Sequence, residues 1–304
     1  RTARPWALAG DVRALRRLVR AQGIELVHAH LTHDHWLTAV ALAGSPARLV
    51  RTVHLRRAVR RDAVSRWLVW RRTSAVIAVS AGIADALRAA GVAPERITVV
   101  PGAVDVERFR PDRDGAAARA QLGLGAGPVV GCVARLTPGR GHELLLHAVD
   151  RLRSRVPTAR LVLVGRGEAR PAIEALVRRL GLDDRVVFAG YRGDDLPDML
   201  AAMDCFVLLG SGSEESCRAV LEAMAAGRPV VAARVGALPE TVAEGRTGWL
   251  VDGDPDRVAE RLAALLLDPD RARTMGEAGR RDAVTRFSQA RRAAAVERVY
   301  ARVL

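Results

Sequence analysis

The sequence of 304 residues lacks features that mark several common classes of protein. No apolar run approaches the roughly 18 residues that a membrane-spanning helix needs, which argues against a membrane-spanning chain. Only three cysteines occur, none of them in a C-x-x-C pair, and the first residues do not resemble a signal peptide. We therefore expect a reducing, cytoplasmic compartment.

Lysine and asparagine are absent altogether. Because there is no lysine, the positive side chains behind the formal charge of +14 are all arginines. The excess is regional, because residues 1–110 hold 19 arginines against 8 acidic residues and residues 111–304 hold 29 against 26. Aromatic residues make up only 4% of the chain, and the basic half shows no nucleic-acid motif. We expect anionic substrates or an anionic surface as partners, and no nucleic acid.

Short apolar runs alternate with amphipathic stretches, which indicates strands and helices in alternating order. The first series of expected strands is 25–29, 48–53, 75–79 and 97–100, with helices near 11–22, 34–43, 58–72 and 81–90. The second series of strands is 128–134, 160–164, 185–189, 204–209 and 229–232, with helices near 142–155, 169–181, 216–226, 255–267 and 270–284. This order predicts an α/β fold of two doubly wound, Rossmann-like domains.

The domain boundary is expected in a stretch rich in proline, glycine and aspartate, where the periodicity is weak. We predict an incomplete N-terminal domain at 1–110, a linker at 111–127 and a C-terminal domain at 128–285. Residues 286–304 are expected to form a helix that crosses back to the N-terminal domain. Parallel sheets of this kind bind ligands at the carboxyl ends of their strands, so the loops that follow the strands carry the chemistry.

Two such loops hold candidate binding groups. Arg135 and Arg140 lie in the glycine-rich loop before a helix start, which suits a diphosphate, although they could also be solvated surface arginines. Glu214 lies in the loop 210–217 and Glu222 about one turn into the following helix, and the amides of residues 216–219 lie at the helix N-terminus, which favours phosphate. Helix capping by acidic residues is the alternative interpretation.

The whole set of segments resembles the retaining glycosyltransferases of family 4, which have the GT-B fold of two domains facing across a cleft. The residues that carry the resemblance are Arg135-Leu136, Arg140-Gly141, Leu163–Gly167, Val187–Gly190, Glu214 with Glu222, Ala225–Val231, Gly236–Glu240 and Gly245–Gly248. The resemblance implies a metal-independent hexosyltransferase without a cofactor, acting in the biosynthesis of cell-envelope polysaccharide or glycolipid. Its partners would be a nucleotide-sugar donor and a saccharide or lipid-linked acceptor.

The resemblance also implies residue roles. Arg135 and Arg140 would hold the donor diphosphate, Glu222 would bond the ribose, and the loop after Gly190 would line the base. Glu214 would contact the transferred sugar as a catalytic residue. The implied donor site is completed by Gly165, Glu215, Ser216, Cys217, Arg218 and Ala219. Two departures from the family pattern are Arg140, where lysine is common, and Glu215-Ser216-Cys217, where Gly-Phe-Gly is usual.

The N-terminal half contributes a histidine cluster, His28, His30, His33 and His35, in HAHLTHDH. Its spacing admits a metal site, a structural role or a lining of the acceptor site, and we favour the acceptor-side role with no metal. His54 follows the strand 48–53 and, by the resemblance, faces the reaction centre as a second catalytic residue.

Residues 56–72 read as a basic amphipathic helix with seven arginines against Asp62. Such a helix suits peripheral contact with an anionic membrane, on its inner face if the protein is cytoplasmic, although an ordinary packing helix fits the pattern too.

Two further expectations concern the class of the protein and the extent of the chain. Family members begin with a strand and a glycine-rich loop that are not found here, so we expect the chain as given to bind a nucleoside diphosphate weakly and to transfer no sugar. A GT-B epimerase and a non-catalytic nucleotide-binding module remain alternatives, the latter because of Gly165-Arg166-Gly167.

Overall fold

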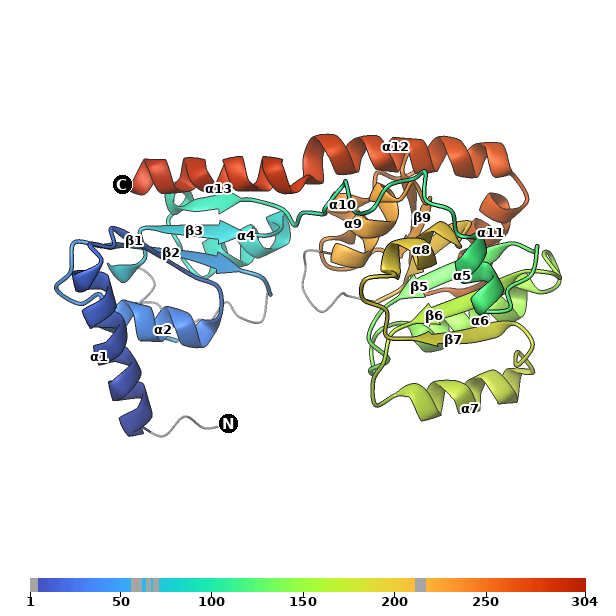
Figure 1. Cartoon of the computed structure of the whole chain (residues 1–304), viewed down its shortest axis with the longest axis horizontal. Coiled ribbons are helices and arrows are strands. Elements are labelled where there is room, and N and C mark those ends of the chain that lie inside the picture. The colour runs from blue at the N-terminus through green and yellow to red at the C-terminus, as the bar shows by residue number, and fades with distance from the viewer. Residues whose placement is uncertain (1–4, 56–61, 64–66, 68–70, 211–216) are drawn as a thin grey trace. The chain divides into compact units, whose positions relative to one another are not determined.

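A computed structural model shows that the chain forms two compact α/β units (Figure 1). It describes residues 5–55, 62, 63, 67, 71–210 and 217–304, with side chains from residue 8 onward. Unit 1 consists of Arg1–Pro101 and Arg292–Leu304, and unit 2 consists of Gly102–Arg291. The predicted pair of parallel α/β domains is confirmed.

Unit 1 is built on a four-stranded parallel sheet in the order β1-β2-β3-β4. The strands are β1 (Leu26–Ala29), β2 (Arg48–Val53), β3 (Ala75–Ala78) and β4 (Ile97–Val99). The helices are α1 (Pro5–Ala21), α2 (Thr32–Ala41), α4 (Ala81–Ala89), the short 3-10 helix η2 (Pro94–Arg96) and the C-terminal α13 (Gln289–Val303). Val299 of α13 packs with Val50 and Ile77, so the last helix covers one face of this sheet.

Unit 2 has a six-stranded parallel sheet in the order β10-β9-β8-β5-β6-β7. Its strands are β5 (Val129–Val133), β6 (Arg160–Val164), β7 (Val186–Gly190), β8 (Cys205–Leu208), β9 (Val230–Ala233) and β10 (Gly248–Val251). Its helices are α5 (Ala116–Gln121), α6 (His142–Leu152), α7 (Arg170–Leu180), α8 (Leu196–Ala201), α9 (Arg218–Ala225), α10 (Leu238–Thr241), α11 (Pro255–Leu266) and α12 (Pro269–Phe287). The sequence pattern missed β10, because this edge strand is a single apolar run directly after a glycine turn.

The core of unit 2 lies on both faces of its sheet, as the alternation of side chains in a strand requires. In β6, Leu161 and Leu163 pack with α6, α7 and α11, whereas Val162 and Val164 pack with α9 and α12. Helix starts are set locally: Asp254 and Asp268 each precede a proline and accept a hydrogen bond from a first-turn N–H of α11 and α12.

The predicted linker is part of unit 2, and the chain changes unit after Pro101 rather than at residues 110–128. Phe109, Ala118 and Leu124 are buried in the unit 2 core, and Val104 pairs with Ser288 in an isolated parallel bridge. The segment lacks periodicity because single side chains and backbone contacts anchor it. The return to unit 1 falls after Arg291 rather than after residue 285, so that all but the first turn of α13 belongs to unit 1.

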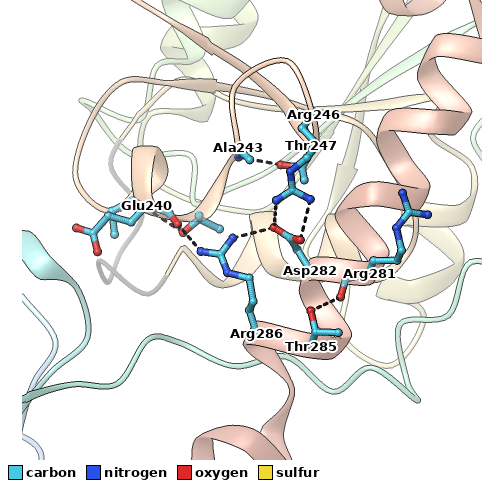
Figure 2. Close-up of polar contacts among 10 residues, drawn as sticks. Glu240, Ala243, Arg246, Thr247, Arg281, Asp282, Thr285 and Arg286 are labelled. Carbon is cyan, nitrogen blue, oxygen red and sulfur yellow. Dashed lines mark hydrogen bonds and ion pairs between the residues drawn. The ribbon is translucent and has the colours of Figure 1, made fainter.

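A charged cluster ties the loop between β9 and β10 to α12 (Figure 2). The two carboxylate oxygens of Asp282 accept hydrogen bonds from Arg246 at 3.0 and 2.7 Å, and one of them accepts a further bond from Arg286 at 2.7 Å. Arg286 also donates to the carbonyl of Glu240. Burial opposes ionisation of Asp282, yet the hydrogen bonds from both arginines outweigh it and hold its pKa below the usual range. The ionised carboxylate is therefore the centre of the clamp.

We predict that Asp282→Ala lowers the free energy of unfolding of unit 2 by about 1.5–3 kcal/mol, because charged hydrogen bonds to a buried carboxylate are lost. Urea unfolding at pH 7 measures the change. As a control, Glu174→Ala removes a surface pair with Arg170 on α7 and should change stability by only about 0.5 kcal/mol. Equal losses in both variants would show that the clamp contributes no more than a surface pair.

Candidate functional site

The candidate site of unit 2 lies where the sheet order reverses. The chain leaves β5 toward β6 on one side, and β8 lies on the other side of β5. In open parallel sheets the connections diverge at such a point and leave room for a ligand at the carboxyl ends of the strands. The loops that follow β5 and β8 are the ones that the sequence singled out.

Close backbone contact fixes these loops against their neighbours. Gly165 after β6 has φ 147°, and a Cβ there would overlap the carbonyl oxygen of Ala134 after β5. Gly141 has φ 78°, and its Cβ would lie 2.6 Å from the backbone carbonyl of Leu209 after β8. The Gly165 N–H donates to the carbonyl of Gly190, the last residue of β7, at 2.8 Å. Glycine is required at both positions, since only glycine combines a positive φ with this approach.

The two predicted diphosphate arginines lie on the β5 loop. Arg135 is exposed, and Arg140 is half-buried directly before α6. His142, the first residue of α6, is buried, and its Nε2 has no hydrogen-bond partner. Burial and then the neighbouring Arg140 lower the pKa of His142, so this imidazole is neutral. His142 was not singled out from the sequence, although it lies at the predicted helix start, close to Arg140.

The start of α9 offers backbone donors. Cys217 caps the helix in the left-handed conformation with φ 49°, which is uncommon for a residue other than glycine, and its side chain is buried. The N–H groups of Arg218 and Ala219 have no partner among the described residues. Together with the helix dipole they form an anion-binding end. Glu214, Glu215 and Ser216 lie outside the described residues, so their predicted roles stay predictions.

Glu222 is a half-buried carboxylate on α9 that receives no hydrogen bond from the described residues. Burial raises its pKa to about 7, and the nearby positive charges of Arg218 and Arg108 offset only part of that rise. A partly desolvated acceptor without a protein donor is suited to the hydroxyl groups of a ligand. The ribose contact expected for Glu222 stays a prediction.

Arg108 was missed because the sequence analysis placed it in the N-terminal domain. In unit 2 it donates to the carbonyl of Gly193, in the loop after β7, at 2.7 Å, and its charge acts on Glu222. Beside this loop, the guanidinium of Arg166 lies over the ring of the exposed Tyr191, 5.0 Å from its centroid. These groups adjoin Gly190, the position from which the sequence predicted a base-lining loop.

In unit 1 the structure brings together three of the predicted histidines, at the carboxyl ends of β1 and β2. His28 stacks on His30 with ring centroids 4.3 Å apart, and His30 Nδ1 is hydrogen-bonded to His54 Nε2 at 3.2 Å. His28 is held by Tyr300 of α13 at 2.6 Å and by Thr52 at 2.8 Å. Burial, and then the charges of His30, Arg292 and His54, lower the pKa of His28 to about 4.

The other two histidines of HAHLTHDH are directed elsewhere, because α2 begins at Thr32 and turns them away from the strand end. His35 is buried against Thr73 at 2.7 Å, and burial lowers its pKa to about 3, so it is a core residue. His33 is exposed. Across the described part of the chain, no group of three histidine, cysteine or acidic side chains has the geometry to hold a metal ion.

Most of the predicted membrane-facing stretch 56–72 lies outside the described residues. None of the helices that the structure describes combines the length and apolar character needed to cross a membrane.

Comparison with known proteins gives two adjacent family matches. The model for Glycosyltransferase Family 4 matches residues 1–108, and the model for Glycosyl transferases group 1 matches residues 127–268. The GDP-mannose-dependent alpha-(1-6)-phosphatidylinositol monomannoside mannosyltransferase of Mycolicibacterium smegmatis is 42% identical over 190 residues, which are 60% of this chain and 50% of that protein. The D-inositol 3-phosphate glycosyltransferase of Nocardia farcinica is 35% identical over 285 residues, 83% of this chain and 61% of that protein. The chain thus spans about half the length of the curated relatives it matches.

Solved structures agree with these matches. Anabaena Alr3699/HepE in complex with UDP and glucose superposes with a TM-score of 0.85 at 26% identity, covering 97% of this chain and 81% of that one. A glycosyltransferase from Rickettsia africae has a TM-score of 0.89 at 17% identity, which shows the shared fold. With two parallel α/β units, both matching models and these relatives, the chain belongs to the family-4 glycosyltransferases of the GT-B fold.

Proposed function

We propose that this chain belongs to a retaining, metal-independent hexosyltransferase that uses a nucleotide-sugar donor. The observation that carries the proposal is Glu222, a half-buried carboxylate that receives no hydrogen bond from the described residues, on the helix whose first N–H groups have no partner among those residues either. In this proposal Glu222 accepts hydrogen bonds from the ribose, and the start of α9 binds the diphosphate.

The names of the relatives support a narrower choice of substrates. The mycobacterial relatives are named for GDP-mannose and phosphatidylinositol monomannoside, and the others for inositol 3-phosphate. We infer mannose from GDP-mannose as the donor and an inositol-containing lipid or inositol phosphate as the acceptor. UDP-glucose is the second candidate donor, because UDP and glucose are bound in the Anabaena structure.

Charge accounts for a reaction without a metal. The leaving diphosphate gains negative charge as the bond to the sugar breaks, and Arg135, Arg140 and the helix N-terminus would stabilise that charge. The acceptor oxygen bonds to the anomeric carbon on the face from which the diphosphate leaves, and its proton passes to a departing phosphate oxygen. Glu214 would hold hydroxyls of the transferred sugar, and His54, which is hydrogen-bonded to His30, is the second proposed catalytic residue.

Peripheral contact with an anionic membrane through residues 56–72 remains a prediction. It suits a lipid-linked acceptor, since each arginine near an anionic surface contributes about 1 kcal/mol to binding.

Nucleotide binding tests the class of the protein. We expect calorimetry on the chain to detect GDP and GDP-mannose, UDP more weakly, and NAD not at all. Transfer is tested on a hybrid of unit 2 with the N-terminal half of the Mycolicibacterium smegmatis relative, because the chain spans about half the length of that relative. Product analysis should show an α-linked hexose, formed in the presence of EDTA. A β-linked product, or activity that requires an added divalent cation, would contradict the mechanism; binding of NAD in preference to GDP would contradict the function.

The two glutamates should respond differently to ligands. Glu222→Ala should weaken binding of bare GDP and of GDP-mannose alike, by about ten- to a hundredfold, because a charged hydrogen bond is worth about 1.5–3 kcal/mol. Glu214→Ala should weaken only GDP-mannose, since only the sugar reaches it. Equal losses for both ligands in both variants would overturn this assignment.

Burial of Glu222 should also reduce stability at neutral pH. Its pKa of about 7 exceeds the unfolded value of 4.5, so the folded protein holds a proton that the unfolded chain releases, and stability falls as the pH rises from 4.5 to 7. We predict that Glu222→Gln raises the unfolding free energy by about 1–3 kcal/mol at pH 8 and leaves it unchanged at pH 4. Urea unfolding at the two pH values measures this. Glu260→Gln on α11, an exposed partner of Arg257, is the control and should show no such dependence.

A further inference from the structure

A cavity lies at the edge of the unit 2 sheet opposite the candidate site. It has a volume of about 740 Å³, within the range of small-molecule sites, and is bordered by Pro128, Asp204 and Pro229. These residues directly precede β5, β8 and β9, so the cavity is at the amino ends of the strands. Helix α9 begins at the candidate site with Arg218 and ends beside this cavity at Ala225.

The cavity is basic. Five arginines line it, Arg119, Arg228, Arg273, Arg280 and Arg281, against the two carboxylates of Asp204 and Glu277. Asp204 pairs with Arg119 at 2.7 Å, and Arg273 pairs with Asp270 at 2.8 Å. The carboxylate of Glu277 is exposed and has no partner among the described residues. Positive charge therefore remains in excess at this surface.

Two of the guanidinium groups donate their hydrogen bonds to backbone carbonyls, although the charge of Asp204 also acts on one of them, Arg228. Arg228 donates to the carbonyls of Ala226 and Met203, and Arg280 donates through Nη1 to the carbonyls of Val106, Phe109 and Ala225. Carbonyl groups orient a guanidinium without neutralising it. Both side chains are half-buried, and burial, the largest cause, lowers the pKa of Arg228. A partly desolvated cation of this kind attracts an anion more strongly than a surface cation does.

Donors remain available on these groups. The Nη2 of Arg228 and the Nε and Nη2 of Arg280 have no hydrogen bond to the described residues, and they are not sealed from solvent. The guanidinium of Arg281 is exposed and makes no side-chain bond. Figure 2 shows it leaving α12 on the side away from Asp282 and its two arginines. Three guanidinium groups thus present free N–H donors to one cavity.

The remaining walls are apolar. Pro111, Leu265, Leu266 and Pro269 line the same cavity. Planar guanidinium donors match the oxygens of a phosphate, and several of them suit an anion with two charges. The mixture of arginine donors with proline and leucine surfaces fits a phosphate that carries an apolar group.

We propose that this cavity is a binding site for an organic phosphate monoester, separate from the candidate donor site. The phosphate is held by Arg228, Arg280 and Arg281, and its organic group lies against the proline and leucine walls. The same chemistry is offered by a free phosphate ester and by the headgroup of phosphatidic acid, and the test separates these two sources.

Calorimetry with phenyl phosphate on the chain of residues 1–304 tests the site. Arg281→Gln should weaken its binding by about five- to tenfold, because one charged donor pair is lost from an exposed side chain that no fold contact uses. Glu277→Gln should strengthen binding, since it removes a repelling carboxylate. Arg179→Gln on α7 is the matched control and should have no effect, because this exposed arginine has no partner among the described residues and does not line the cavity. GDP affinity should be the same in all three variants.

Vesicles separate the two sources. Phosphatidylcholine vesicles that contain phosphatidic acid are sedimented with the protein. If the protein binds these vesicles, and if both Arg281→Gln and added phenyl phosphate reduce that binding, the site is assigned to a lipid headgroup. Binding of phenyl phosphate without binding to the vesicles would assign the site to a free ester. Equal phenyl phosphate affinity in wild type and Arg281→Gln would overturn the proposal. Loss of that binding in Arg135→Ala instead would do so too, because the anion would then occupy the donor site.

Discussion

The candidate donor site depends on the close approach of backbones at the carboxyl edge of one parallel sheet. Gly165 meets Ala134, and Gly141 meets Leu209, so the loops after β5, β6 and β8 hold one another in position. Without side chains between them, the loops need no separate core. This contact determines where Arg140 and the start of α9 lie, and it explains why a short, irregular loop can present charged groups at defined positions.

Polar groups are partly desolvated at this edge of the sheet and at the corresponding edge of the unit 1 sheet. Glu222 has a raised pKa because burial outweighs the attraction of Arg218 and Arg108. In unit 1, burial makes His28 neutral while Tyr300 and Thr52 fix its ring. Groups whose surroundings oppose their charge are typical of sites that bind ligands, because the protein gives up stability to hold a polar group ready.

Arginine serves three structural purposes in a chain without lysine. Arg246 and Arg286 clamp a buried carboxylate, Arg228 and Arg280 bind the carbonyls at the end of α9, and Arg166 lies on an aromatic ring. A planar group with five donors can make such contacts in several directions at once, which a single ammonium does less well. The net charge therefore overstates how many arginines are available to ligands. The end of α9 is an exception, because Arg228 and Arg280 there have N–H donors that form no hydrogen bond with the described residues.

Sequence motifs carried the resemblance to the family. The sequence by itself also determined the fold class and nearly every strand, because period-two and period-3.6 patterns are local signals. It placed Arg135, Arg140 and Glu222 on the correct elements for the same reason. Only the tertiary structure decided that residues 102–127 belong to unit 2, where Phe109 and Leu124 are buried, and that Arg108 therefore acts on Glu222. It alone separated His35 from His28 and joined His28 to Tyr300, which lies 272 residues further along the chain. Contacts over such distances, and the desolvation that shifts a pKa, arise from packing and leave no periodic trace in the sequence.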